Sequence, residues 1–476
     1  MVSTPRTPES SKHGHTFDLD AIAAGLVFGQ SLAALTGALT GAEATGAAVV
    51  QAPPGSGKTT LVPPLLANLL PRECGRVVVT QPRRVAARAA ARRLASLDGG
   101  PLGERVGYTV RGEHHAGPKT VVEFVTPGIL LRRLLADPGL DGVAAVVLDE
   151  VHERGLETDL LLGMLAEVRQ LRGELAVVAM SATLDAPRFA ALLADDDGVP
   201  APVVDSPSAL FPLTVQWRPA TRPRLDERGV TRAFLEHVAD TAAAAHADAL
   251  AADPGVDALV FAPGGWEVAQ IAGRLRAGRP GTEVLELHGQ APAAEQDRAV
   301  SGRRAGDPPR IIVSTSLAES SLTVPGVRLV IDSGLSREPR RDAARGMSGL
   351  VTVSCSRASA EQRAGRAARQ GPGTVVRCYD ERAYAAAPAH PTPEIAVADL
   401  TQAALVLACW GPRPVAAWHC PTRRPRPPWT TPWRCCANWA PSGRTGWPRP
   451  SARPWPRSPR TRGWPGPSWT GPPWSA

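Results

Sequence analysis

The segment Gln51–Thr60 restricts what this chain can fold into more than any other stretch. It reads Gln-Ala-Pro-Pro-Gly-Ser-Gly-Lys-Thr-Thr, follows the apolar run 48–50, and precedes a helical pattern over 61–70. A strand, a glycine-bearing turn that ends in Gly-Lys-Thr, and a helix together form a cradle for nucleotide phosphates. The usual pattern has a glycine where this chain has Ala52, so an unrelated glycine-rich turn before a helix is the alternative interpretation.

Each residue type in this segment suits the cradle. Gly55 and Gly57 let the backbone curl so that successive N–H groups face phosphate oxygens, and the following helix directs its positive end at the same anion. The ammonium of Lys58 would reach the outer phosphates, and the hydroxyl of Thr59 would bind Mg²⁺. We therefore predict that ATP is held by Gly55, Ser56, Gly57, Lys58, Thr59 and Thr60.

A second motif follows the most apolar strand pattern of the first half, residues 143–148. There the sequence places two adjacent carboxylates, Asp149 and Glu150. At the tip of a buried strand, Asp149 can hold Mg²⁺ and Glu150 can polarise the attacking water of nucleotide hydrolysis. An acidic pair that merely caps the next helix is the alternative, and the phosphate loop upstream disfavours it.

Length and composition limit the class of protein. A chain of 476 residues suggests two or three domains. No apolar run reaches the roughly 18 residues that span a bilayer, and the polar segment 1–15 lacks the apolar core of a signal peptide. We expect a cytoplasmic protein without a membrane partner. The seven cysteines show no paired metal-ligand spacing, which indicates reduced thiols.

The net charge of +8 suggests a nucleic-acid partner, but its distribution does not. Residues 413–476 contain eleven arginines and no acidic residue. Without them, 42 basic residues face 45 acidic ones. Any nucleic-acid contact in the body of the chain must therefore come from individually placed residues.

In the first half of the chain, three further strand patterns are each followed by a polar motif. Residues 76–80 lead to Gln81-Pro-Arg-Arg84, residues 121–125 lead to Thr126-Pro-Gly128, and residues 175–180 lead to Ser181-Ala-Thr183. Ligands of parallel sheets bind at the carboxyl ends of the strands. Arg83 and Arg84 would therefore suit a nucleic-acid phosphate, whereas a solvated helix start is the alternative interpretation.

The second half repeats the alternation of strands and helices, which indicates another parallel doubly wound sheet. Strand patterns cover 257–261, 283–287, 310–313 and 327–331, helices cover 231–253 and 266–276, and residues 212–223 read as a linker. No second phosphate loop is present, so this domain would serve the nucleotide of the first. In the segment Ser359–Arg369, arginines at a spacing of three residues could converge on one anion.

Taken in this order, the motifs resemble the DEAH-box group of superfamily 2 helicases, in which Ala at the position of Ala52 is ordinary. The resemblance implies that Arg366 and Arg369 act as arginine fingers and that Gln362 orients the attacking water. It implies that His152, Ser181 and Thr183 couple the nucleotide state to strand separation. Ala368 replaces the last glycine of the arginine motif.

The same resemblance suggests a path for nucleic acid. Residues 315–324 match the family's backbone-contacting motif, with Ser316 and Ser320 as departures, and residues 335–354 match a hairpin that acts as a strand-separating wedge. The predicted nucleic-acid contacts are Arg83, Arg84, Thr126, Gly128, Gly289 and Thr315.

The end of the chain breaks this pattern. Residues 394–410 form an apolar helix pattern that resembles the opening of a winged-helix domain. Residues 413–476 then hold 16 prolines and nine tryptophans but one aliphatic side chain larger than alanine, Val415. Such a segment cannot bury a conventional core. We interpret it as out-of-frame coding sequence in preference to a disordered arm that stacks on single strands.

The sequence thus predicts an α/β chain with two tandem RecA-like domains. The expected parts are a disordered start (1–16), an ATP-binding domain (17–204), a C-terminal helicase domain (205–385), the start of a winged-helix region (386–412) and the tail (413–476). We predict a monomeric, Mg²⁺- and ATP-dependent helicase that moves 3′ to 5′ and prefers RNA to DNA. The alternatives are a nucleic-acid-binding ATPase without unwinding activity, or a metabolic kinase, which would need no arginine-bearing second domain.

Overall fold

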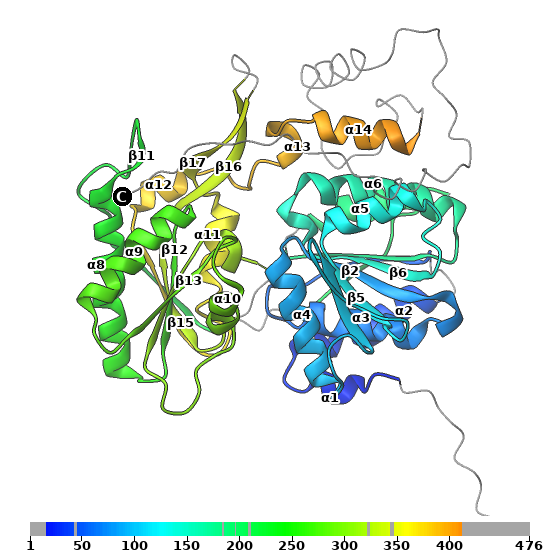
Figure 1. Ribbon diagram of the computed structural model, residues 1–476, viewed down its shortest axis with the longest axis horizontal. Helices are drawn as coiled ribbons and strands as arrows, with labels where there is room; N and C mark the ends of the chain where they lie inside the picture. Colours follow the sequence, from blue (N-terminus) through cyan, green and yellow to red (C-terminus); the bar gives the residue numbers. More distant parts are fainter. Residues whose placement is uncertain are drawn as a thin grey trace, which may run out of the picture.

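The computed structural model contains two α/β domains side by side, with a short helical segment lying over the first (Figure 1). It describes residues 16–41, 45–182, 185–195, 197–207, 211–320, 324–342 and 347–411. The predicted fold class, two tandem doubly wound domains, is confirmed. The proposed tail, 413–476, and the first fifteen residues of the predicted disordered start lie outside the described residues.

The first domain is built on an eight-stranded sheet with the order β4-β3-β5-β2-β6-β7-β1-β8, parallel except for β4. Its strands are β1 (Ala47–Gln51), β2 (Arg76–Thr80), β3 (Val106–Val110), β4 (Glu113–His115), β5 (Val122–Val125), β6 (Val143–Leu148), β7 (Ala176–Ser181) and β8 (Val203–Asp205).

Helices cover both faces of this sheet because alternate strand residues point to opposite sides. In β1, Ala47 and Val49 belong to one apolar core, and Ala48 and Val50 belong to the other. The first core contains residues of α5 (Pro127–Ala136), η3 (Val151–Glu153), α6 (Leu156–Leu171) and α7 (Ala186–Leu192). The second contains residues of α1 (Leu19–Ala23), η1 (Val27–Ser31), α2 (Leu32–Thr40), α3 (Lys58–Leu69) and α4 (Arg84–Leu97), and the short η2 (Arg72–Cys74) precedes β2.

The second domain has a six-stranded parallel sheet with the order β13-β14-β12-β15-β18-β9. Its strands are β9 (Leu213–Trp217), β12 (Asp257–Phe261), β13 (Glu283–Leu287), β14 (Arg310–Ser314), β15 (Val327–Asp332) and β18 (Gly373–Arg377). Its helices are α8 (Arg232–Ala252), α9 (Gly265–Gly278), α10 (Ala293–Val300), η4 (Ser316–Ala318), α11 (Arg357–Ala364) and α12 (Glu381–Ala385). Two small antiparallel ribbons complete it, β10 (Leu225–Asp226) with β11 (Gly229–Val230), and β16 (Leu335–Asp342) with β17 (Met347–Ser354).

Two sequence-based expectations about this domain have different outcomes. The linker predicted over 212–223 is wrong in part, because Leu213–Trp217 forms β9 and pairs in parallel with β18. This strand lies at the sheet edge and its central residues are exposed, so it lacks the apolar pattern of a buried strand. The predicted hairpin is present as β16 and β17, although residues 343–346 at its tip lie outside the described part.

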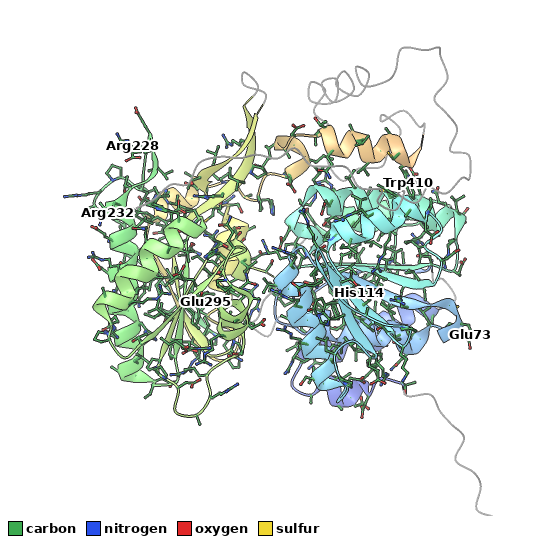
Figure 2. The ribbon with its side chains drawn as sticks, viewed as in Figure 1. Glu73, His114, Arg228, Arg232, Glu295 and Trp410 are labelled. Atoms are coloured by element: carbon green, nitrogen blue, oxygen red, sulfur yellow. The ribbon has the colours of Figure 1, made fainter. Side chains whose placement is uncertain are left out.

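The expectation of a single helix over 394–410 is also wrong. The segment forms two helices, α13 (Glu394–Val397) and α14 (Thr401–Trp410), which are separated by Ala398–Leu400. Apolar residues of both helices pack into the same core as α5 and α6, so this segment belongs to the first domain by packing. Trp410 lies over that domain, and its indole donates a 3.0 Å hydrogen bond to Glu167 (Figure 2).

Each sheet contains a buried carboxylate that is bound by arginines. Glu123 in β5 accepts two hydrogen bonds from Arg133 and one each from Arg76 and Thr109. Asp257 in β12 accepts bonds from the backbone and guanidinium of Arg310, which is itself fully buried. Burial of these carboxylates without such partners would be strongly unfavourable.

None of the helices in the described part of the chain combines the length and the apolar character that a membrane crossing demands. The four cysteines in the same part are free thiols.

Candidate active site and nucleic-acid groove

The phosphate loop connects β1 to α3 as the sequence predicts. Gly55 and Gly57 adopt φ angles of 86° and 99°, which favour glycine because a Cβ would be strained there. α3 begins at Lys58, whose side chain is buried, and Thr60 closes the first turn by donating to the carbonyl of Gly57. The loop therefore presents the helix N-terminus and one buried ammonium group to the same place.

The two predicted carboxylates lie opposite this loop at the end of β6. The hydroxyl of Thr59 and the amide of Gln81 each donate to Asp149 Oδ2 at 2.6 Å. Lys58 Nζ lies 3.7 Å from Glu150 Oε1. Sequence reasoning did not assign Gln81 to this site. The residue directly follows β2, and the sequence does not specify that β2 pairs with β6.

Burial and charge act differently on the two carboxyls. Burial, followed by the neighbouring charge of Glu150, raises the pKa of Asp149 to about 6. Burial also disfavours ionisation of Glu150, but the charges of Lys58, Arg366 and Arg369 outweigh it, and the pKa of Glu150 lies below its ordinary value. Glu150 is thus held as the carboxylate that a general base requires.

The donor set fits a Mg²⁺ ion. A threonine hydroxyl beside a buried carboxylate supplies the hard oxygen ligands that Mg²⁺ prefers. Among the described residues, three further buried oxygens around this point have no hydrogen-bond partner: Ser56 Oγ, Gln81 Oε1 and Glu150 Oε2. Buried polar atoms are normally satisfied, so these oxygens indicate a place for a polar ligand or for water.

Two of the three predicted coupling residues, His152 and Ser181, lie close to the acidic pair. His152 lies in η3, and its Nδ1 accepts a 3.1 Å hydrogen bond from the backbone N–H of Ala182. Burial lowers the pKa of His152, which favours the neutral imidazole. Ser181 is fully buried at the end of β7, and its carbonyl accepts from Ala52 at the start of the phosphate loop. Thr183 lies outside the described residues.

The second domain contributes arginines to the same site. Arg369 lies against the phosphate loop, since a Cβ added to Gly55 would be 3.1 Å from its Cδ. The buried Arg366 donates to the carbonyls of Glu319 and Ser320, and its positive charge helps to lower the pKa of Glu150. Gln362 is half-buried on α11, one turn before Arg366.

The expectation that the three arginines of this motif converge on one anion is wrong for Arg363. Its guanidinium donates to the carboxylates of Glu319 and Asp332, each at 2.9 Å, and to the carbonyl of Leu335. The helix α11 ends at Ala364, so the residues after it turn Arg366 and Arg369 toward the first domain. Arg363 instead links the motif to the start of the hairpin.

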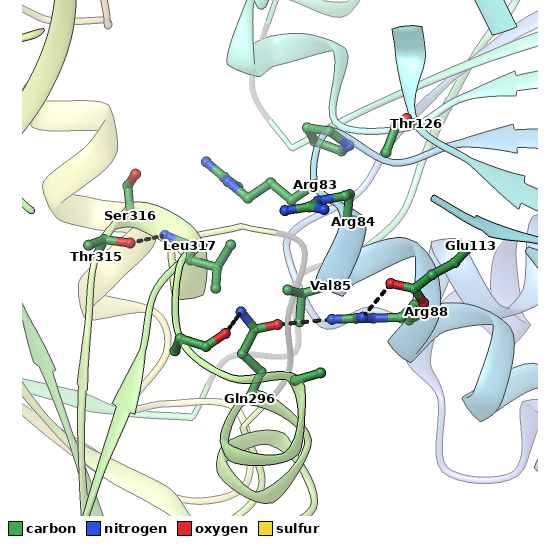
Figure 3. Close-up of a pocket in the computed structure, with 14 residues that line it drawn as sticks. Arg83, Arg84, Val85, Arg88, Glu113, Thr126, Gln296, Thr315, Ser316 and Leu317 are labelled. Atoms are coloured by element: carbon green, nitrogen blue, oxygen red, sulfur yellow. Dashed lines mark hydrogen bonds and ion pairs between the residues drawn. The ribbon is translucent and has the colours of Figure 1, made fainter. Parts of the chain in front are cut away.

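A groove of about 580 Å³ between the domains is lined by most of the residues that are predicted to contact nucleic acid (Figure 3). In Figure 3, Arg83 and Arg84 extend from the first-domain side toward Thr315 and Ser316 of the second. Of the six predicted contacts, those that line this groove are Arg83, Arg84, Thr126, Gly289 and Thr315. Gly128 does not line it, because it faces Glu157 on α6.

Two arginines at the groove also join the domains. Arg83 donates to Glu153 at 3.0 Å and to Ser320 of the second domain at 3.1 Å, so its guanidinium is engaged across the cleft. Arg88, which the sequence did not single out, donates to Glu113 and to Gln296 of α10 (Figure 3). Only the tertiary arrangement brings α4 and α10 together, so no sequence signal could have found this pair.

A phosphate loop and an acidic pair on one RecA-like domain, with arginines supplied by a second, define the class of two-domain helicase motors. Comparison with known families supports this. Residues 33–190 match the DEAD/DEAH box helicase model, and residues 243–371 match the helicase conserved C-terminal domain. Together the two regions make up more than half of the chain, and the chain belongs to the DEAD/DEAH-box helicases.

Individual relatives agree with this family. The chain is 37% identical to the ATP-dependent RNA helicase HrpB of Escherichia coli, over 78% of this chain and 44% of that relative. It is 35% identical to a probable ATP-dependent RNA helicase, the DHX35 homolog of Caenorhabditis elegans, over 77% of this chain and 50% of the relative.

Solved structures show the same likeness. A crystal structure of the DEAH/RHA helicase HrpB from E. coli superposes with a TM-score of 0.76 and 33% identity, covering 87% of this chain and 50% of that one. The chain thus spans about half the length of the relatives that it matches.

Proposed function

We propose that this chain hydrolyses ATP at the interface of its two domains and uses the cycle to move along nucleic acid. The observation that carries the proposal is the position of Arg369, which reaches from the second domain to Gly55 of the phosphate loop. A nucleotide in this cleft would touch both domains. Its binding and loss would therefore change their relative position, which is what a motor requires.

The roles of the residues follow from their places. Lys58 and the N-terminus of α3 would hold the outer phosphates, and Glu150 would take the proton of the attacking water. Arg366 and Arg369 would stabilise the charge that develops on the transferring phosphoryl group, a contribution worth roughly 10³–10⁵ in rate in related chemistry. Gln362 would orient the water. Mg²⁺, held by Thr59 and Asp149, would neutralise charge on the phosphate oxygens when bound.

The polymer would pass through the groove of Figure 3. Arginine and threonine side chains at loop ends suit a sugar-phosphate backbone and carry little sequence information. We propose single-stranded RNA as the preferred substrate because the relatives are named RNA helicases. Movement from 3′ to 5′ and duplex separation at the β16–β17 hairpin are parts of the same proposal.

A second candidate is an ATPase that holds nucleic acid without unwinding it. The region shared with the relatives is about half of their length, so unwinding is a separate proposal from hydrolysis. A duplex-displacement assay with a 3′ overhang distinguishes the two. Release of the short strand in the presence of ATP supports the motor, and hydrolysis without release supports the second candidate.

The first experiment is ATP hydrolysis by this chain with and without single-stranded RNA and DNA. Stimulation by RNA above DNA is the expected result. Glu150→Gln should abolish turnover and preserve nucleotide binding, since the amide keeps the shape but cannot accept the proton. Unchanged turnover in this variant would refute the assignment of Glu150, and an inactive wild-type chain would refute the proposal.

A further inference from the structure

Helix α6 begins directly after the acidic pair and its following turn, and its first residue is preceded by Gly155. A helix leaves its first N–H groups without partners inside the helix, and a side chain at the N-cap usually accepts from them. Glycine has no side chain to do this. The N-terminus of α6 therefore has no acceptor from the side chain of its own N-cap.

Glu394 supplies this acceptor from a distant part of the sequence. Its carboxylate Oε2 accepts a 2.8 Å hydrogen bond from the N–H of Leu156, and its own N–H donates to the carbonyl of Arg154 at 3.1 Å. These two bonds fix the backbone on either side of Gly155. A carboxylate at this place also complements the positive end of the α6 dipole.

The turn to which Glu394 is bonded begins at Glu150, the proposed general base. Glu150 and Arg154 both adopt left-handed backbone angles, φ 55° and 54°, which are unfavourable for residues with a Cβ and persist only where surrounding contacts impose them. The near end of this turn is fixed by β6. Its far end is fixed at Arg154 and Leu156, where Glu394 makes both of its bonds.

Glu394 is itself held firmly. It is the first residue of α13, and the next residue, Ile395, is almost fully buried in the core shared with α5 and α6. α13 also contacts β16 of the hairpin. Glu394 thus lies where the segment after the second domain, the hairpin and the acidic turn meet.

We propose that Glu394 is a positioning residue for ATP hydrolysis: it clamps the far end of the acidic turn and thereby holds Glu150 in its left-handed conformation. The proposal rests on the proposed ATPase function. It predicts that Glu394 affects the rate of the chemical step and leaves the binding of ATP to the phosphate loop unchanged.

The test compares three variants of the full chain. Glu394→Ala removes the acceptor and should lower kcat for ATP about tenfold, with KM within about twofold, because a hydrogen bond to a charged group is lost. Glu394→Gln keeps an oxygen acceptor and should remain within about threefold of wild type. Gln402→Ala, at an exposed position of α14 in the same segment, is the matched control and should match wild type.

Amide hydrogen exchange provides a readout that needs no turnover. Exchange over 154–160 should be faster in Glu394→Ala than in wild type and unchanged in the Gln402→Ala control, while the thermal transition of the whole chain keeps its midpoint. An unchanged kcat in Glu394→Ala, or unchanged exchange at these amides, would overturn the clamp. If the wild-type chain has no turnover, the ATPase proposal fails, and the exchange measurement still decides whether the clamp exists.

Discussion

Replacing Glu123 by glutamine tests whether the buried carboxylate of β5 stabilises the first domain through its charge. The side chain is fully buried, and three residues donate hydrogen bonds to it. Glutamine preserves the size and one acceptor oxygen. The change therefore removes the negative charge and leaves Arg133 and Arg76 without it.

The size of the effect follows from the pKa of this group. Burial alone would raise it, but the hydrogen bonds from Arg133 and Thr109, with the charge of Arg133, lower the pKa of Glu123 from 4.5 to about 2. At about 1.4 kcal/mol for each pKa unit, the lowered pKa of Glu123 corresponds to a stabilisation of the folded domain by about 3 kcal/mol. Both arginines are about a third exposed, so solvent screening reduces the figure to about 2 kcal/mol.

The pH dependence has a definite sign. A carboxyl whose pKa is lower in the folded state binds protons more readily when the chain is unfolded. Its contribution to the free energy of unfolding is therefore complete when the pH is above 4.5, the pKa of the group in the unfolded chain. It is lost as the pH falls from 4.5 toward about 2. The stability difference between wild type and Glu123→Gln should be constant near pH 7 and should narrow below pH 4.5.

Urea denaturation followed by hydrogen exchange of the β2 and β5 amides measures the first domain separately from the second. Glu174→Gln, which changes an exposed carboxylate bound to Arg172, is the control and should have little effect. Equal stability of Glu123→Gln and wild type at pH 7 would refute the reasoning. A difference that grows in acid would refute its sign.

Three further predictions concern residues of the second domain. Arg369→Ala should lower ATP hydrolysis by about 10³-fold or more with nucleotide affinity changed only a few-fold, measured by turnover and by titration with a fluorescent nucleotide; a loss of affinity alone would contradict its role as a finger. Arg363→Met should cost about 3–5 kcal/mol in thermal or urea unfolding, because two buried carboxylates lose the arginine that is paired with them, and a stable variant would contradict this. Gln296→Ala should weaken binding of single-stranded RNA several-fold in a fluorescence anisotropy titration, because Gln296 holds the 288–291 loop beside Gly289, and unchanged affinity would contradict it.

Several parts of the site could be predicted because their chemistry is local in the sequence. The glycines of the phosphate loop are required by backbone angles within a few residues, and Lys58 and Thr59 follow in fixed geometry. The acidic pair could be predicted because a strongly apolar strand precedes it. The roles assigned to these residues remain predictions, as do the domain boundaries and Mg²⁺.

Other parts could not be predicted because they depend on which strands and helices become neighbours. Gln81 reaches Asp149 only because β2 pairs with β6, and the sequence pattern does not specify that order. Arg363 has the same spacing as Arg366 and Arg369, yet it points into its own domain because α11 ends after Ala364.

The sequence by itself therefore determined the two doubly wound domains and the residues at the ends of their strands, since strand periodicity and turn chemistry are properties of short segments. The tertiary structure alone decided which of these residues meet. Arg369 lies at Gly55, Arg88 at Gln296, and Glu394 at Leu156, each across more than 200 residues of chain. Such contacts depend on the packing of whole domains, which no short segment specifies.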